Sequence, residues 1–204
     1  MNIVSELSFR ALENKYLYIA CPHLLGLLSQ HFAGDEATGI LAYCYIKHEE
    51  GLQFEVLCKS MFDADKKTIR FFDANDEVSF GLPYGLMQSN AVMVLPEAIL
   101  PLDKHKAKVA KLAVYGASEE QQKARNIAAI DGSRRPEQPD EVLVYLSHEE
   151  TVETVYVRLE GVGKMDLYGT LLNEPQQDFG IHEGEELHFF IAKNEQGIMC
   201  IAPR

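Results

Sequence analysis

The sequence has no tryptophan and only four cysteines among 204 residues, and it lacks the long apolar run of a membrane-spanning helix. No stretch of about 18 apolar residues occurs. The first 15 residues, MNIVSELSFRALENK, lack the basic segment and apolar core of a secretory signal. The cysteines form no C-x-x-C pair, so a zinc ribbon or a thioredoxin-type site is not expected. These absences predict a cytoplasmic protein with reduced cysteines.

Basic residues are scarce. The chain has 19 Lys and Arg against 31 Asp and Glu, a formal charge of -12. Such a surface repels nucleic acid and anionic membranes, and we expect neither as a partner. Two interpretations stay open: the acidic surface meets a basic protein partner, or it serves only solubility.

Signatures of catalysis and of cofactor binding are also missing. The sequence contains no G-x-x-x-x-G-K-[ST], G-x-G-x-x-G, H-E-x-x-H or G-x-S-x-G. None of the seven histidines pairs with another at i, i+4 spacing on a predicted helix. We therefore expect no cofactor and no dedicated metal site, and we assign no catalytic residue.

What remains is an ordinary globular composition, with 47% hydrophobic and 25% charged residues. Residues 131–140 (DGSRRPEQPD) hold two prolines, a glycine and mixed charge, and no apolar side chain. Such a segment is typical of a linker. We expect an α+β domain at 1–130, a linker at 131–140 and a small β-rich domain at 141–204.

The first domain is predicted to be an antiparallel meander with helices. Apolar spacing favours helices over 4–14 and from Pro22 to Gly34, and a strand over 15–21. Strands over 38–48 and 52–60, joined at 49–51, would place Tyr43 and Tyr45 on the same face as Phe54 and Val56. Further strands are expected over 68–72 and 77–80, across a turn at 73–76.

The following segment carries helix signals. Residues 86–100 favour neither helix nor strand, since prolines interrupt them. Asp103 is positioned to cap a helix reaching about Tyr115. Ser118 and Gln121 form a capping box that opens a second helix, ending near Gly132.

The last 64 residues alternate with period two. Strands are expected over 142–146, 154–160, 187–192 and 198–202, with a turn at 194–197, and another strand halts at Asn173-Glu174-Pro175. Five strands in so short a segment are typical of a small barrel.

The stretch from Asp166 to Phe190 gathers four polar candidates: Asn173, Asp178, His182 and Glu183. A carboxylate and an imidazole within hydrogen-bond reach can perform acid–base chemistry, and Asp178 could meet His182 across the loop. Turn chemistry around Pro175 and Gly184 explains the same residues and is favoured. Cys21, before Pro22-His23, could be a nucleophile at a helix start, but a buried structural cysteine is the better interpretation.

Three further candidates lie on strands. Tyr156 and Tyr168 fall on the outward faces, near Arg158. Exposed tyrosine beside arginine is typical of protein interfaces, although cross-strand pairing explains the pattern equally well.

One resemblance covers about 50 residues. Three segments are similar to the C-terminal region of small bacterial β-rich domains: Val155-Tyr156-Val157-Arg158, Tyr168-Gly169-Thr170-Leu171-Leu172-Asn173-Glu174-Pro175 and His182-Glu183-Gly184-Glu185-Glu186-Leu187. Those domains are of unknown function, and some are linked to toxin–immunity systems. The resemblance implies a bacterial cytoplasmic protein and supplies no catalytic residues.

Two functions follow as hypotheses. The first is a non-enzymatic, immunity-like module that binds a basic protein. The second is a small hydrolase with a cleft between its domains that uses Asp178 and His182, or Cys21.

Overall fold

The computed structural model describes residues 1–75, 77–195 and 197–204, which divide into two compact units, Met1–Gly116 and Ala117–Arg204. Unit 1 contains an antiparallel sheet with helices, and unit 2 contains a separate closed barrel. The predicted α+β class is therefore confirmed. The two units are described separately below.

The described strands of unit 1 form one sheet in the order β1-β7-β2-β3-β4-β5, and β6 adds to β4. Their bounds are β1 Asn2–Ile3, β2 Tyr16–Ala20, β3 Gly39–Lys47, β4 Gly51–Asp63, β5 Thr68–Phe71, β6 Gly81–Pro83 and β7 Ala91–Leu95. β4 pairs with β3 along most of its length, then with β6 near its start and β5 near its end. This long central strand organises the unit.

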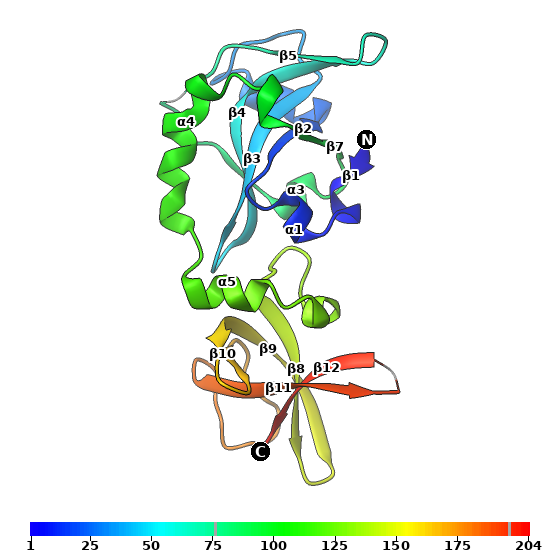
Figure 1. The fold of residues 1–204 in the computed structure, drawn as a ribbon, viewed down its shortest axis with the longest axis vertical. Helices are drawn as coiled ribbons and strands as arrows, with labels where there is room; N and C mark the ends of the chain where they lie inside the picture. Colours follow the sequence, from blue (N-terminus) through cyan, green and yellow to red (C-terminus); the bar gives the residue numbers. More distant parts are fainter. Residues whose placement is uncertain (76, 196) are drawn as a thin grey trace. The chain divides into compact units, whose positions relative to one another are not determined.

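Both faces of the sheet are covered. The helices of unit 1 are α1 Phe9–Leu12, α2 Leu25–Leu28, α3 Tyr84–Met87 and α4 Leu102–Lys111, with 3₁₀ turns η1 Val4–Glu6, η2 Pro22–Leu24, η3 Glu97–Ile99 and η4 Leu112–Tyr115. Figure 1 shows α4 on one side of the strands, and α1 and α3 on the other. Leu12, Leu28 and Met87 join the core on one face, whereas Val109 of α4 packs with Leu57 on the other. The first ten residues of β4 are all buried because the sheet is covered on both faces, and they include the polar side chains of Gln53, Glu55 and Lys59.

The predicted register of the central hairpin was wrong by one residue. Lys47 pairs with Gly51, so His48, Glu49 and Glu50 form a three-residue turn, and Glu49 adopts a positive φ of 52°. Phe54 therefore lies opposite Cys44, and the side chain of Tyr45 shares its face with Gln53. A one-residue shift moves every side chain to the other face. A bulge between Leu41 and Ala42 then shifts the pairing again.

Several helix predictions for unit 1 also need correction. Residues 4–14 form two short turns, η1 and α1, because Ser8 caps a new helix by accepting a hydrogen bond from Ala11 N. The helix expected from Pro22 to Gly34 ends at Leu28. α4 begins at Leu102 after Pro101, so Asp103 lies in its first turn and is not the cap. Residues 77–80 are not strand, and the strand begins at Gly81. The ambiguous 86–100 segment contains β7 and η3.

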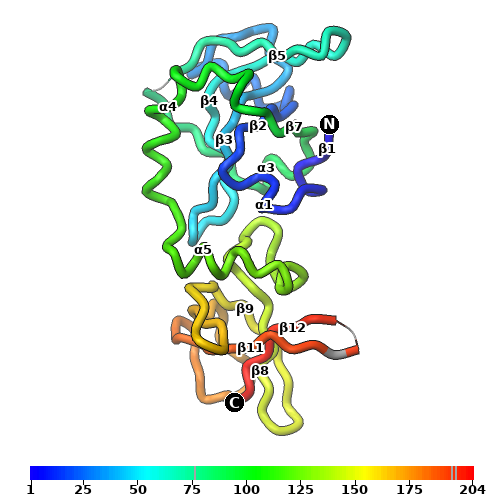
Figure 2. The backbone as a smooth tube through the Cα atoms, in the orientation of Figure 1, coloured from blue at the N-terminus to red at the C-terminus, as the bar shows by residue number. Residues whose placement is uncertain are grey.

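Unit 2 begins with the helices α5 (Glu119–Arg125) and η5 (Ala128–Ser133). The strands that follow form a closed barrel: β8 Glu141–His148, β9 Thr151–Val162, β10 Leu167–Leu171, β11 Glu186–Asn194 and β12 Gly197–Pro203. Among the described residues the strand order is β10-β11-β12-β8-β9, with β12 and β8 parallel. Figure 2 shows the end of β12 beside β8. The predicted barrel-like module and the Ser118–Gln121 capping box are confirmed.

Residues 131–140 do not connect the two units. The boundary falls at Gly116, and the 131–140 segment packs inside unit 2. Arg134 is buried, and its guanidinium donates to Pro139 O and to Ala124 O. The composition that suggested a linker instead provides charged groups that satisfy backbone carbonyls in a buried position.

Two predicted turns, 73–76 and 194–197, include Asp76 and Gln196, which lie outside the described residues. In the part of the chain that the structure describes, no helix is long and apolar enough to cross a membrane.

Candidate functional site

The segment between β10 and β11, residues 172–185, holds the four polar candidates, and carboxylates anchor it. Asn173 Oδ1 accepts a hydrogen bond from Tyr156 N at 2.8 Å, which ties the end of β10 to β9. Glu153 accepts from the backbone N–H groups of Gln176 and Gln177 at 2.7 and 3.2 Å. Each bond satisfies a backbone donor that the sheet leaves unpaired. Asn173 therefore has a structural role.

His182 pairs with Glu174, a partner that the sequence did not suggest. His182 Nδ1 lies 2.7 Å from Glu174 Oε1, and Glu183 N donates to Glu174 Oε2 at 2.8 Å. Glu185 closes the same turn by accepting from His182 N at 2.9 Å. The hydrogen bond that His182 donates to Glu174 raises the pKa of His182, and the same bond lowers the pKa of Glu174. The pair clamps the turn before Gly184, whose φ is 85°.

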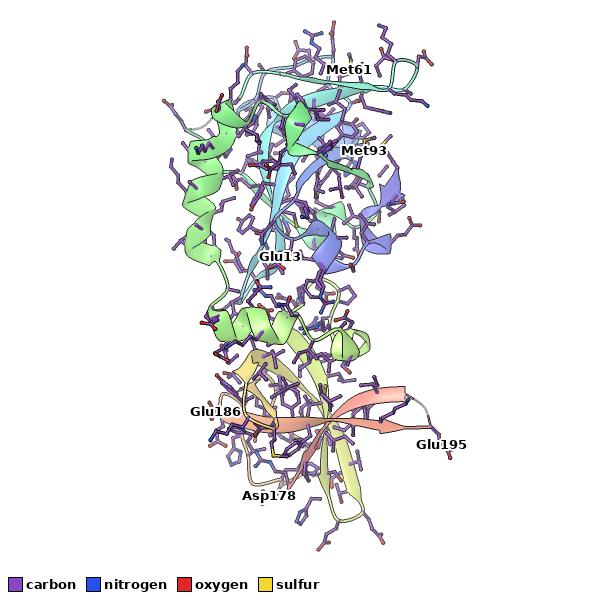
Figure 3. The ribbon with its side chains drawn as sticks, viewed as in Figure 1. Glu13, Met61, Met93, Asp178, Glu186 and Glu195 are labelled. Carbon is purple, nitrogen blue, oxygen red and sulfur yellow. The ribbon has the colours of Figure 1, made fainter. Side chains whose placement is uncertain are left out.

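Asp178 is not the hydrogen-bond partner of His182. Its carboxylate accepts from Gly180 N at 2.9 Å, forming a local turn at the outer edge of unit 2 (Figure 3). Between these polar residues, Phe179 and Ile181 are buried in the barrel core. Two buried apolar side chains therefore fix the loop to the barrel core, and its polar residues form the hydrogen bonds of its turns.

We expect a titration to show the His182–Glu174 pair. In the folded protein the pKa of His182 should lie above the ordinary value of 6.5, and Glu174→Gln should lower it. The stabilisation from the raised His182 pKa is complete below the unfolded histidine value and is lost as pH rises through the folded one. The stabilisation of the folded state by the ionised Glu174 is lost as pH falls through its lowered pKa. NMR of the imidazole Cε1–H measures the midpoint.

His188, which contacts Asp166 at 2.8 Å, is the internal control, because Glu174→Gln should leave its midpoint unchanged. An identical His182 midpoint in wild type and Glu174→Gln would contradict the pairing.

Tyr156 and Arg158 belong to a charged cluster around Glu141. Arg158 Nη2 lies 3.6 Å from Glu141 Oε1, and Arg135 Nη1 donates to Glu141 Oε2 at 3.0 Å. The Arg135 guanidinium lies 5.0 Å from the ring centroid of Tyr156. The arginine that stacks on Tyr156 is therefore Arg135, which the strand pattern alone could not identify. These contacts secure the outer face of β9 to the 131–140 segment.

Tyr168 packs against a glycine on the neighbouring strand. It pairs in register with Gly161, and a Cβ at Gly161 would lie 2.5 Å from the Tyr168 hydroxyl oxygen. Its ring also lies 5.8 Å from that of His188. An aromatic side chain over a strand glycine covers backbone that would otherwise be exposed. Tyr168 is thus a cross-strand packing residue.

Cys21 does not have the surroundings of a nucleophile. Its thiol is fully buried, and burial raises its pKa to about 12. The thiolate is the reactive form of cysteine, and this environment suppresses it. The structural interpretation of Cys21 is the one that the burial supports.

An apolar groove on unit 2 was missed by the sequence reasoning. A cleft of about 350 Å³ is lined by Ile127, Val162, Gly163, Lys164, Met165, Asp166, Leu167, Phe190 and Ile191. Met165 is 90% exposed, Phe190 44% and Ile191 42%. Phe189 fills the barrel, whereas Phe190 and Ile191 lie outside its core. The three consecutive apolar residues Phe189-Phe190-Ile191 were the available signal, because an alternating strand cannot bury all of them in one core.

Over residues 1–75, 77–195 and 197–204, no group of three or more His, Cys, Asp or Glu is arranged to hold a metal ion. Neither the cleft beside Phe190 nor a second cleft, in unit 1 beside Tyr45, is lined by Asp178 or His182. The sequence matches no protein-family model, and comparisons with curated proteins and with solved structures find no significant match.

Proposed function

We propose that the protein is a non-enzymatic binding module whose barrel, unit 2, docks a basic protein partner. The groove beside Phe190 carries the proposal. It exposes three large apolar side chains around a cleft that an apolar side chain can enter. Central apolar anchors supply most of the free energy of protein–protein binding.

The charge of unit 2 specifies the kind of partner. Residues 117–204 contain 17 Asp and Glu against eight Lys and Arg, a formal charge of -9, whereas residues 1–116 carry -3. The acidic excess is thus concentrated on the unit that bears the groove. A basic protein that presents an apolar side chain would be steered by this field and held by the groove.

The polar residues of the 172–185 loop and Cys21 have surroundings that favour structural roles over hydrolysis, which supports the binding function. Asn173, Glu174 and Asp178 satisfy backbone donors of their own loop, and Cys21 is buried. An immunity-like role, in which the acidic barrel masks a basic toxin, is consistent with the resemblance of the C-terminal region and belongs to the same proposal.

Matched variants test the groove. Phe190→Asp should abolish capture of a stoichiometric partner from the host cell, because a charge in the apolar cleft costs its desolvation. Val152→Asp adds the same charge at another exposed apolar position of unit 2 and should leave capture intact. Raising the salt concentration should weaken the wild-type complex.

Capture that is lost equally in both variants, or that is insensitive to Phe190→Asp, would reject the groove as the docking site. Failure to recover any partner at low and moderate salt would count against the binding function itself.

A further inference from the structure

A second cleft lies in unit 1, on the side of the sheet that α4 and η4 cover. Its volume is about 480 Å³, and β3, β4, β6 and η4 supply its walls. Its lining residues include Tyr45, Lys47, Gln53, Gly81, Lys111 and Tyr115. The docking function proposed above uses none of them.

The floor of this cleft is polar and buried. A Cβ placed on Gly81 would lie 3.6 Å from Tyr45 Oη, 3.9 Å from Gln53 Oε1 and 3.9 Å from Glu55 Oε2. Tyr45 and Gln53 are each 6% exposed, and Glu55 is 1% exposed. Three oxygen atoms from buried side chains therefore converge above a residue that has no side chain. Buried polar groups aimed at one point are typical of a small-molecule site.

The hydrogen-bonding roles of these three side chains are set by their other contacts. Gln53 Nε2 donates to Glu50 O at 3.2 Å, so Oε1 is the acceptor that faces Gly81. Burial, followed by the nearby charge of Glu55, raises the pKa of Tyr45, and its hydroxyl stays protonated. Glu55 Oε2 accepts from Ser79 Oγ at 3.2 Å, so the floor offers the hydroxyl of Tyr45 and the acceptor oxygen of Gln53. A ligand hydroxyl, which both donates and accepts, matches this set.

The rim carries positive charge and an aromatic face. Lys47 and Lys111 line the cleft. Lys47 Nζ forms an ion pair with Glu50 Oε2 at 3.0 Å, and the charge of Glu55 is met by Lys108 at 3.2 Å. The ring of Tyr115 lies 5.5 Å from that of Tyr45 and is partly exposed. The Lys47 ammonium also lies 4.9 Å from the centroid of the Tyr115 ring, so Lys111 is the lining ammonium group that favours an anionic group on the ligand.

We propose that this cleft binds a small polyhydroxylated molecule with one anionic group, of the sugar phosphate class. The hydroxyl groups meet Tyr45 and Gln53 on the floor, and the anion lies at the rim beside Lys111.

Titration calorimetry of the full chain with glucose 6-phosphate tests the site, with glucose and inorganic phosphate as separate arms. We expect glucose 6-phosphate to bind with a dissociation constant of about 1 mM or tighter. Gly81→Ala should weaken it by about tenfold or more, because the new methyl group contacts all three floor oxygens. Lys111→Gln should bring glucose 6-phosphate down to the affinity of glucose.

Gly85→Ala is the matched control. Gly85 lies in α3 of the same unit, and a Cβ there meets no atom within 4 Å. Neither glycine has a positive φ, so both variants should fold. The absence of saturable binding by all three probes, equal binding by Gly81→Ala and wild type, or phosphate binding as tightly as glucose 6-phosphate would each overturn the proposal.

Discussion

Asp140→Asn is expected to destabilise unit 2 by about 3–5 kcal/mol, the cost of leaving one partner of a buried ion pair unmatched. Arg125 Nε and Nη2 donate to the two oxygens of Asp140 at 2.8 and 2.6 Å, and both side chains are 3% exposed. The bidentate bond attaches α5 to the start of β8. The asparagine keeps the shape but removes the carboxylate charge that the buried Arg125 guanidinium contacts through two hydrogen bonds.

The measurement must separate the two units, because a chain with two compact parts need not unfold in one step. Native-state hydrogen exchange does so: amides of β8 and β9 should lose protection in Asp140→Asn, whereas those of β3 should keep it. Arg125→Met combined with Asp140→Leu should recover much of the loss, since an apolar pair leaves no charge buried.

Glu120→Gln is the exposed control. Glu120 pairs with Lys123 on the open surface of α5, and its replacement should leave the protection of β8 unchanged. Unaltered barrel protection in Asp140→Asn would show that the Arg125 pair does not stabilise unit 2.

The second large effect is expected from Lys108→Met in unit 1, again about 3–5 kcal/mol. Lys108 Nζ lies 3.2 Å from Glu55 Oε1 and donates to Val56 O at 2.7 Å and Val78 O at 2.6 Å. The side chains of Lys108 and Glu55 are 4% and 1% exposed. Methionine keeps the straight stem but removes the ammonium group, so a carboxylate and two carbonyls lose a donor inside the unit.

In this variant the amides of β3 and β4 should lose protection and those of β8 should not, the reverse of the Asp140→Asn result. Lys106→Met, on the exposed side of the same helix, controls for the loss of one positive charge. Equal protection of β4 in Lys108→Met and Lys106→Met would contradict the role assigned to the buried ion pair.

Local sequence signals predicted the elements that depend on neighbouring residues. The alternation of Val155, Val157 and Leu159 placed these side chains inside the barrel, and all three are buried. The capping box at Ser118 forms because both of its hydrogen bonds are made within four residues. Such features need no knowledge of the rest of the chain.

The sequence predictions were wrong where contacts between residues distant in the sequence determine the structure. Residues 131–140 were predicted to form a linker, yet Arg134 is buried and donates hydrogen bonds to Ala124 O and Pro139 O. His182 was matched with Asp178 because the two are close in sequence. The partner found, Glu174, lies across the loop and is brought back when Phe179 and Ile181 enter the core. A pattern of residue types in the sequence does not show which distant residues come into contact in the folded chain.

The parallel pairing of β12 with β8 has a consequence for synthesis of the chain. Cys200 lies opposite Val144, so the contact that closes the barrel joins residues far apart in sequence. The ordering cost of such a contact must be met before the contact stabilises anything, which slows folding. Unit 1, whose strands end at Leu95, can assemble during translation. The barrel must wait for β12, and until then the edges of β8 and β11 are open to incorrect pairing.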